Sequence, residues 1–153
     1  MGTDMKLSQM GEISHEQQEF MNRTPYMNMV GALQYAADCT RPDIAYVTGQ
    51  LARHLQKFDL EHLFAAKRVF QYLKGSSDKW LVLGGHDQFV SHSFCDADGM
   101  VTSGNKSILG YVFQFGNGTV SWSSKRSDLV PLLTYEAKIQ ALAHAMKEAI
   151  WIK

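Results

Sequence analysis

Two carboxylates, Asp96 and Asp98, lie shortly after the run QFVSHSF at residues 88–94 and are candidates for a metal site. The alternation within QFVSHSF predicts a strand. A nuclease that uses two divalent ions holds them with several acids, so these two serve that chemistry only if other acids converge on them. The plain alternative is a pair of turn residues at a strand end, because Asp followed by Gly is common turn chemistry.

The composition describes a globular chain without a strong charge. The chain has 153 residues, of which 45% are apolar, and its 15 basic residues equal its 15 acidic ones. That balance gives no general attraction to nucleic acid, so any such binding needs a local patch. Two cysteines, no signal-like N-terminus and no long apolar run predict an intracellular protein, in cytoplasm or nucleus, that does not enter a membrane.

The first half of the chain has helical periodicity. We expect three helices. The first begins near Ser14, runs to Asn22 and restarts at Pro25 through YMNMVGALQYAA, the second begins at Thr40-Arg-Pro42-Asp43, and the third extends from Asp59 to Gly75. Thr40 is the expected N-cap of the second of these. Its packing face should carry apolar residues at helical spacing, namely Ile44, Val47, Leu51 and Leu55.

In the second half the period shortens to about two residues, which indicates strands. The expected strands cover residues 80–85, 88–94, 107–115 and 118–124, with FGNGT at 115–119 as a hairpin turn. A final helix is predicted from Thr134 to Ile152. We expect its large apolar residues to face the core, namely Tyr135, Ile139, Leu142, Met146 and Ile150. The fold class is therefore α+β, with helices, then antiparallel strands, then a helix.

Several segments together carry a family resemblance. They are TPYMNMVGALQYAADCTRPDIAYVTGQLARHL, AAKRVFQYLKGSSD, CDAD, SILGYVFQFGNGTVSWSSK and TYEAKIQALAHAMKEAIWIK. In order and spacing they resemble the C-terminal part of a copia-type retrotransposon polyprotein. The resemblance implies that residues 1–80 are a helical region like a reverse transcriptase thumb and connection. It implies that residues 81–153 are a truncated ribonuclease H-like domain, an antiparallel hairpin sheet with a C-terminal helix that lacks the later strands.

The resemblance also assigns the candidate site. Ribonuclease H uses four carboxylates around two divalent metals, and Asp96 matches the first of these acids. The second should be a Glu at the position of Lys138, while Glu136 matches a non-catalytic acid. The next acid would lie on a strand beyond Lys153. An ammonium group in place of a carboxylate repels a divalent cation, so we expect an incomplete metal site at Asp96 and no cofactor, with Mg²⁺ only if the protein is active.

Two functions therefore compete. The first is a retrotransposon-derived fragment that is catalytically inactive and acts by binding nucleic acid or a protein. The alternative is an active ribonuclease H that cleaves RNA in RNA:DNA hybrids and takes its missing acids from another chain. Weak binding to a hybrid would use Lys67, Arg68, Lys125 and Arg126. The plain alternative is that these side chains only face solvent. The resemblance leaves one edge of the strand at QFVSHSF without a partner, so a homodimer or another protein is expected there.

Overall fold

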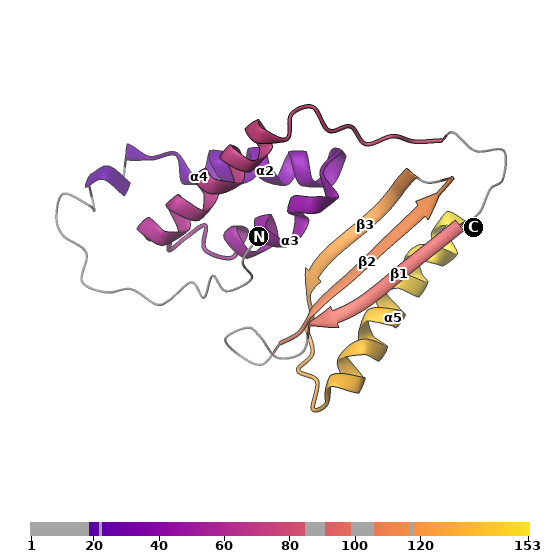
Figure 1. Ribbon diagram of the computed structural model, residues 1–153. Coiled ribbons are helices and arrows are strands. Elements are labelled where there is room, and N and C mark those ends of the chain that lie inside the picture. Colours follow the sequence, from indigo (N-terminus) through magenta and orange to yellow (C-terminus); the bar gives the residue numbers. More distant parts are fainter. Residues whose placement is uncertain (1–18, 22, 85–90, 99–105, 117) are drawn as a thin grey trace. The chain divides into compact units, whose positions relative to one another are not determined.

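The computed structural model describes residues 19–21, 23–84, 91–98, 106–116 and 118–153 (Figure 1). The chain divides into two compact units, residues 1–79 and residues 80–153. Within the described ranges, no helix is long and apolar enough to cross a membrane.

The first unit is helical. It contains α2 (Tyr26–Cys39), the 3₁₀ helix η1 (Pro42–Ile44), α3 (Ala45–Ala52) and α4 (Leu60–Gly75), and residues 19–21 and 23 are helical as well. Apolar side chains from these helices form one core, in which the large and fully buried members are Tyr26, Val30, Leu33, Ile44, Leu51, Leu63 and Val69. The predicted face of Ile44, Val47, Leu51 and Leu55 is confirmed, because all four belong to or pack against this core.

The helix ends agree with the sequence at Asp59 but not at Thr40. The Asp59 carboxylate accepts the backbone N–H of His62 at 3.0 Å and begins α4. The expectation that Thr40 starts a helix is wrong. Its backbone N–H donates to the Ala36 carbonyl at 3.1 Å, so Thr40 ends α2, and the next helix begins as a 3₁₀ turn at Pro42. Proline fits there because the first turn of a helix has no use for its missing N–H.

The second unit contains a three-stranded antiparallel sheet. Its strands are β1 (Ser91–Asp98), β2 (Ile108–Phe115) and β3 (Gly118–Arg126), in the order β1-β2-β3. The predicted hairpin is confirmed, and Gly116 adopts a φ of 52°, which glycine tolerates best. In the pairing of β1 with β2, Ser93 lies opposite Phe113 and Ala97 opposite Leu109.

Two strand predictions differ from the structure. Residues 80–84 were expected to be in a strand but have no regular structure, and Trp80 is 85% exposed. The run is apolar on both faces, and a strand of that kind needs to be covered on both sides of the sheet. The strand expected at 88–94 is confirmed for residues 91–94 but continues further than predicted, to Asp98, while residues 85–90 lie outside the described part of the chain. Asp96 is thus inside a strand, not in a turn.

Helix α5 (Thr134–Ile152) packs on β1 and β2 (Figure 1). Its limits are those predicted, but its buried face is not. Ala137, Ala141 and Ala145 contact the sheet and are at most 6% exposed. The expected stripe is 48% to 74% exposed, namely Tyr135, Ile139, Leu142, Met146 and Ile150. Small alanine side chains at i, i+4 and i+8 let the helix backbone approach the sheet closely, which turns the large residues outward.

Candidate functional site

Asp96 and Lys138 are brought together by β1 and α5. Successive strand residues point to opposite faces of a sheet. Ala97 packs with Ala137 and Ala141 of α5, so its neighbour Asp96 belongs to the other face. Because β1 is the outer strand of the sheet that the structure describes, the Lys138 side chain can reach past its free edge to Asp96.

The two side chains form a direct ion pair. Lys138 Nζ donates to Asp96 Oδ1 at 2.8 Å, and the same oxygen accepts the backbone N–H of Ala97 at 2.8 Å. The hydrogen bond from Lys138, with that from Ala97, lowers the pKa of Asp96, and the Asp96 carboxylate raises the pKa of Lys138. The side chains of Lys138 and Asp96 are 60% and 73% exposed, so water screens this attraction. The pair keeps Asp96 ionised and compensates its charge.

Glu136 does not join this pair. Its carboxylate accepts the backbone N–H of Leu132 at 2.8 Å and so stabilises the start of α5. Glu136 and Lys138 are two residues apart, which separates them by about 160° around a helix. Glu136 is therefore not placed beside the Asp96–Lys138 pair.

The acidic residues that the structure describes do not form a site for a pair of magnesium ions. Magnesium sites require oxygen ligands, commonly several carboxylates. Within the described ranges, no group of three or more His, Cys, Asp or Glu side chains is arranged so that it could hold a metal ion. At Asp96 the neighbouring charged group is a cation, and an ammonium beside a carboxylate competes with a divalent ion for the same oxygen.

Of the four predicted nucleic-acid contacts, two belong to each unit of the chain. Lys67 and Arg68 are exposed on α4, where Lys67 Nζ lies 5.4 Å and 5.9 Å from the ring centres of Phe20 and Phe64. Lys125 and Arg126 are consecutive residues of β3 and therefore point to opposite faces of the sheet. Lys125 is 63% exposed and lies 3.9 Å from Asp128. Their role in binding remains a prediction.

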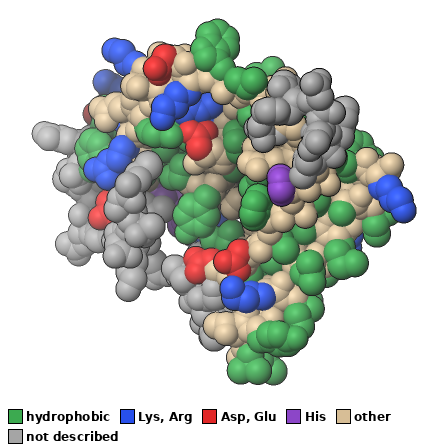
Figure 2. Space-filling view, turned by 45° about the vertical axis from the view of Figure 1, so that its right-hand side comes forward, with side chains coloured by type: hydrophobic (Ala, Val, Ile, Leu, Met, Phe, Trp, Pro, Cys, Tyr) green, Lys and Arg blue, Asp and Glu red, His purple; other side chains and the backbone are tan. Residues whose placement is uncertain are grey.

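One surface feature was missed because the sequence placed it in the core. The exposed apolar face of α5 continues into a shallow groove beside β1, with a volume of about 90 Å³, which is lined by Ser93, Phe94, Cys95, Phe113, Leu142, Ala145, Met146 and Ala149. Hydrophobic side chains run along the lower right of Figure 2, over α5. A stripe of alanines at helical spacing is the sequence signal that identifies the buried face instead.

The structure thus defines an α+β protein with a helical unit and a unit in which a helix covers a three-stranded antiparallel sheet. No family model matches the chain, and no solved structure matches it significantly. The origin of the chain is therefore inferred from proteins of similar sequence.

Three relatives cover most of the chain. The Retrovirus-related Pol polyprotein from transposon TNT 1-94 of Nicotiana tabacum is 40% identical over 90% of the chain, which corresponds to 10% of the polyprotein. The polyprotein from transposon RE1 of Arabidopsis thaliana is 35% identical over 84% of the chain and 9% of its own length. Secreted RxLR effector protein 161 of Plasmopara viticola is 36% identical over 86% of the chain and 94% of the effector.

The chain therefore belongs to one family with effector protein 161 and is homologous, over most of its length, to Pol polyproteins of copia-type retrotransposons. It spans about a tenth of the length of the polyproteins.

Proposed function

We propose that this protein is a ribonuclease H-like fragment of a copia-type Pol polyprotein that does not cleave RNA:DNA hybrids and acts by binding nucleic acid or a protein. In this proposal residues 1–80 correspond to the thumb and connection of a reverse transcriptase, and residues 81–153 to the ribonuclease H-like domain. The homology to Pol polyproteins and the helix packed on an antiparallel sheet both support it.

The observation that carries the proposal is the ion pair of Lys138 and Asp96, at 2.8 Å. In the proposed domain, Asp96 is the first metal-binding acid and the residue across from it on the helix should be a second carboxylate. Its replacement by lysine changes the charge beside Asp96 by two units. A cation there offsets the charge that would attract a divalent ion, which supports loss of cleavage.

The alternative is an active, magnesium-dependent ribonuclease H. It requires that Lys138 move away from Asp96 and that another chain supply several carboxylates. Hybrid cleavage that is lost in Asp96→Asn distinguishes this alternative from the binding function.

Weak binding to an RNA:DNA hybrid follows from the equal numbers of acidic and basic residues, 15 of each. Contacts through Lys67, Arg68, Lys125 and Arg126 would be made to phosphates, and nonspecific binding of this type has a Kd of about 10⁻⁴ to 10⁻⁶ M. Four phosphate contacts would give a slope of log K against log salt no steeper than about −4.

The test is to titrate a fluorescently labelled hybrid at several salt concentrations. We expect the double variant Lys67→Ala and Arg68→Ala to reduce the slope by up to about two. Lys147→Ala, an exposed lysine on α5, is the matched control and should leave the slope unchanged. Tight binding that does not depend on salt would contradict phosphate contacts.

A further inference from the structure

Two imidazole rings lie against each other where the turn after α3 meets the start of α4. His54 belongs to the turn 53–59, which joins the two helices, and His62 belongs to the first turn of α4. Their ring centres are 4.0 Å apart, and the ring planes are inclined by 42°. Both residues belong to the helical unit, outside the candidate site at Asp96. Because like charges repel, two titratable rings in contact cannot both take up a proton without a penalty.

His62 is buried, and its Nδ1 makes two contacts that require opposite forms of this atom. The residue is 3% exposed. The backbone N–H of Asp59 donates to Nδ1 at 3.3 Å, which requires a free lone pair on the nitrogen. The Asp59 carboxylate contacts the same nitrogen, which requires a proton there. A charged His62 would therefore keep its contact with the carboxylate and lose the one with the backbone N–H.

The other nitrogen of the His62 ring would gain nothing from a proton. Among the residues that the structure describes, Nε2 of His62 is buried and has no hydrogen-bond partner. A cationic imidazole carries an N–H on each nitrogen, and a buried N–H without an acceptor costs free energy. A charged His62 would thus be paired at one nitrogen and unpaired at the other.

The surroundings of His54 also oppose a positive charge. Burial lowers the pKa of His54, and His62 and Arg53 lower it further, whereas Asp59 raises it with the smallest effect. The ordinary value is 6.5, so the unfolded chain takes up this proton at a higher pH than the folded chain does. Below about pH 6.5 the free energy of unfolding therefore falls as the pH falls.

The turn 53–59 rests on side-chain contacts at this end of the helical core. Gln56 and Lys57 are exposed, Leu55 packs against the core, and Phe58 stacks on Tyr26 with ring centres 4.4 Å apart. Segments with few buried contacts open locally at a lower free energy than the core unfolds. Loss of one contact should therefore open the turn before it unfolds the helices.

We propose that the contact between His54 and His62 is an acid-sensitive latch. Above about pH 6.5 the uncharged His54 ring packs on His62 and holds the turn 53–59 against the start of α4. Protonation of His54 below that pH separates the rings, opens the turn and exposes Phe58, while α2 and the rest of α4 stay folded. This conformational switch is independent of nucleic-acid binding and of the loss of cleavage.

Amide hydrogen exchange of the full chain, followed by NMR between about pH 7.5 and about pH 5.5, measures the opening. The amide of His54 donates to the Leu51 carbonyl at 3.1 Å and that of His62 to the Asp59 carboxylate at 3.0 Å, so both report on the turn. After correction for intrinsic exchange rates, we expect their protection to fall at least about threefold towards the acid end. The amide of Leu33, in the core of α2, should keep its protection.

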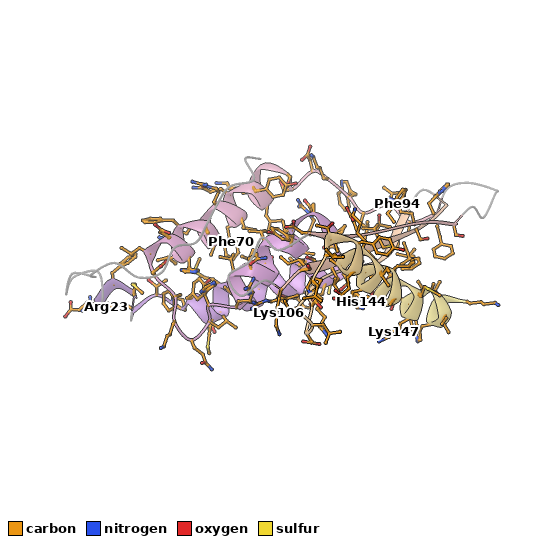
Figure 3. All side chains as sticks on the ribbon, turned by 90° about the horizontal axis from the view of Figure 1, so that it is seen from below. Arg23, Phe70, Phe94, Lys106, His144 and Lys147 are labelled. Atoms are coloured by element: carbon orange, nitrogen blue, oxygen red, sulfur yellow. The ribbon has the colours of Figure 1, made fainter. Side chains whose placement is uncertain are left out.

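Two substitutions test whether His54 is the group that titrates. His54→Phe keeps an aromatic ring beside His62, and His54→Gln keeps a polar side chain, but neither takes up a proton. In both variants we expect the pH dependence of exchange at the turn to disappear. His144→Phe is the matched control, because His144 is a partly buried histidine of α5 whose pKa burial also lowers, and it lies outside the helical unit (Figure 3). It should leave the pH dependence at the turn unchanged.

Three results would overturn the proposal. The first is protection of the turn that stays constant over this pH range. The second is loss of protection at Leu33 together with the turn, which would mean acid unfolding of the whole helical unit. The third is a pH dependence that persists in both His54→Phe and His54→Gln, because another group would then control the turn.

Discussion

Replacing Ala141 and Ile139 in turn tests which face of α5 is buried. Ala141 is 1% exposed and lies against the sheet, whereas Ile139, two residues away, is 48% exposed. Ala141→Leu forces three more carbon atoms into a closely packed contact, and overpacking of this kind costs about 1 to 3 kcal/mol. Ile139→Ala removes a side chain that is half in water and leaves no closed cavity, so it should cost less than about 1 kcal/mol.

The magnitudes reverse if the large apolar residues of α5 face the sheet. Ile139→Ala would then cost about 2 to 5 kcal/mol, as for other buried Ile→Ala changes. Ala141→Leu would then change an exposed position and cost less than about 0.5 kcal/mol. The order of the two costs therefore decides the orientation, even if each single value departs from its range.

Urea unfolding followed by tryptophan fluorescence suits this comparison. All three tryptophans, Trp80, Trp122 and Trp151, lie within residues 80–153, so their emission reports the unit that contains α5. Each variant is measured at two protein concentrations tenfold apart, because a contact between chains would make the midpoint depend on concentration. A larger loss of stability from Ile139→Ala than from Ala141→Leu, equal at both concentrations, would refute the burial of the alanine face of α5.

Three further outcomes follow from individual contacts. Lys138→Met should raise the pKa of Asp96 towards its ordinary value, which carboxyl NMR can measure. The control is Asp43, whose pKa is held low by Arg41 and Tyr72 and should stay unchanged. Burial, with a smaller effect of Asp59, raises the pKa of Tyr26 to about 12, so the folded state keeps this proton when the unfolded chain loses it. The contribution of Tyr26 to stability should therefore fall between about pH 10 and 12, and Tyr26→Phe should remove that fall in urea unfolding. Leu63 is 0% exposed, so Leu63→Ala should lower the free energy of unfolding by about 2 to 5 kcal/mol, measured by urea unfolding followed with far-UV circular dichroism.

Helix limits and the hairpin were predictable because local chemistry determines them. Asp59 is a strong N-cap, and the FGNGT sequence contains the glycine that a turn with positive φ requires. Thr40 misled the prediction, because a threonine between two helices can end the first or begin the second. The sequence alone does not say which backbone groups will be near it.

The face of α5 was not predictable from hydrophobicity alone. Large apolar residues and alanines both recur at helical spacing on this helix, and hydrophobicity gives more weight to the large ones. Close contact with a sheet favours the small ones, since Ala137 and Ala141 allow a shorter distance between the layers. The same contact places Lys138 beside the edge of β1, so its pairing with Asp96 depends on packing that single-residue patterns do not contain.

Cleavage of an RNA:DNA hybrid in the presence of magnesium tests the central proposal most directly. The full chain is compared with Asp96→Asn and with Lys138→Glu, using a labelled RNA strand. We expect no cleavage above background by any of the three. Lys138→Glu alone should not restore activity, because in the part of the chain that the structure describes no third ligand joins Asp96 and position 138. Magnesium-dependent cleavage by the unaltered chain that disappears in Asp96→Asn would contradict the proposal.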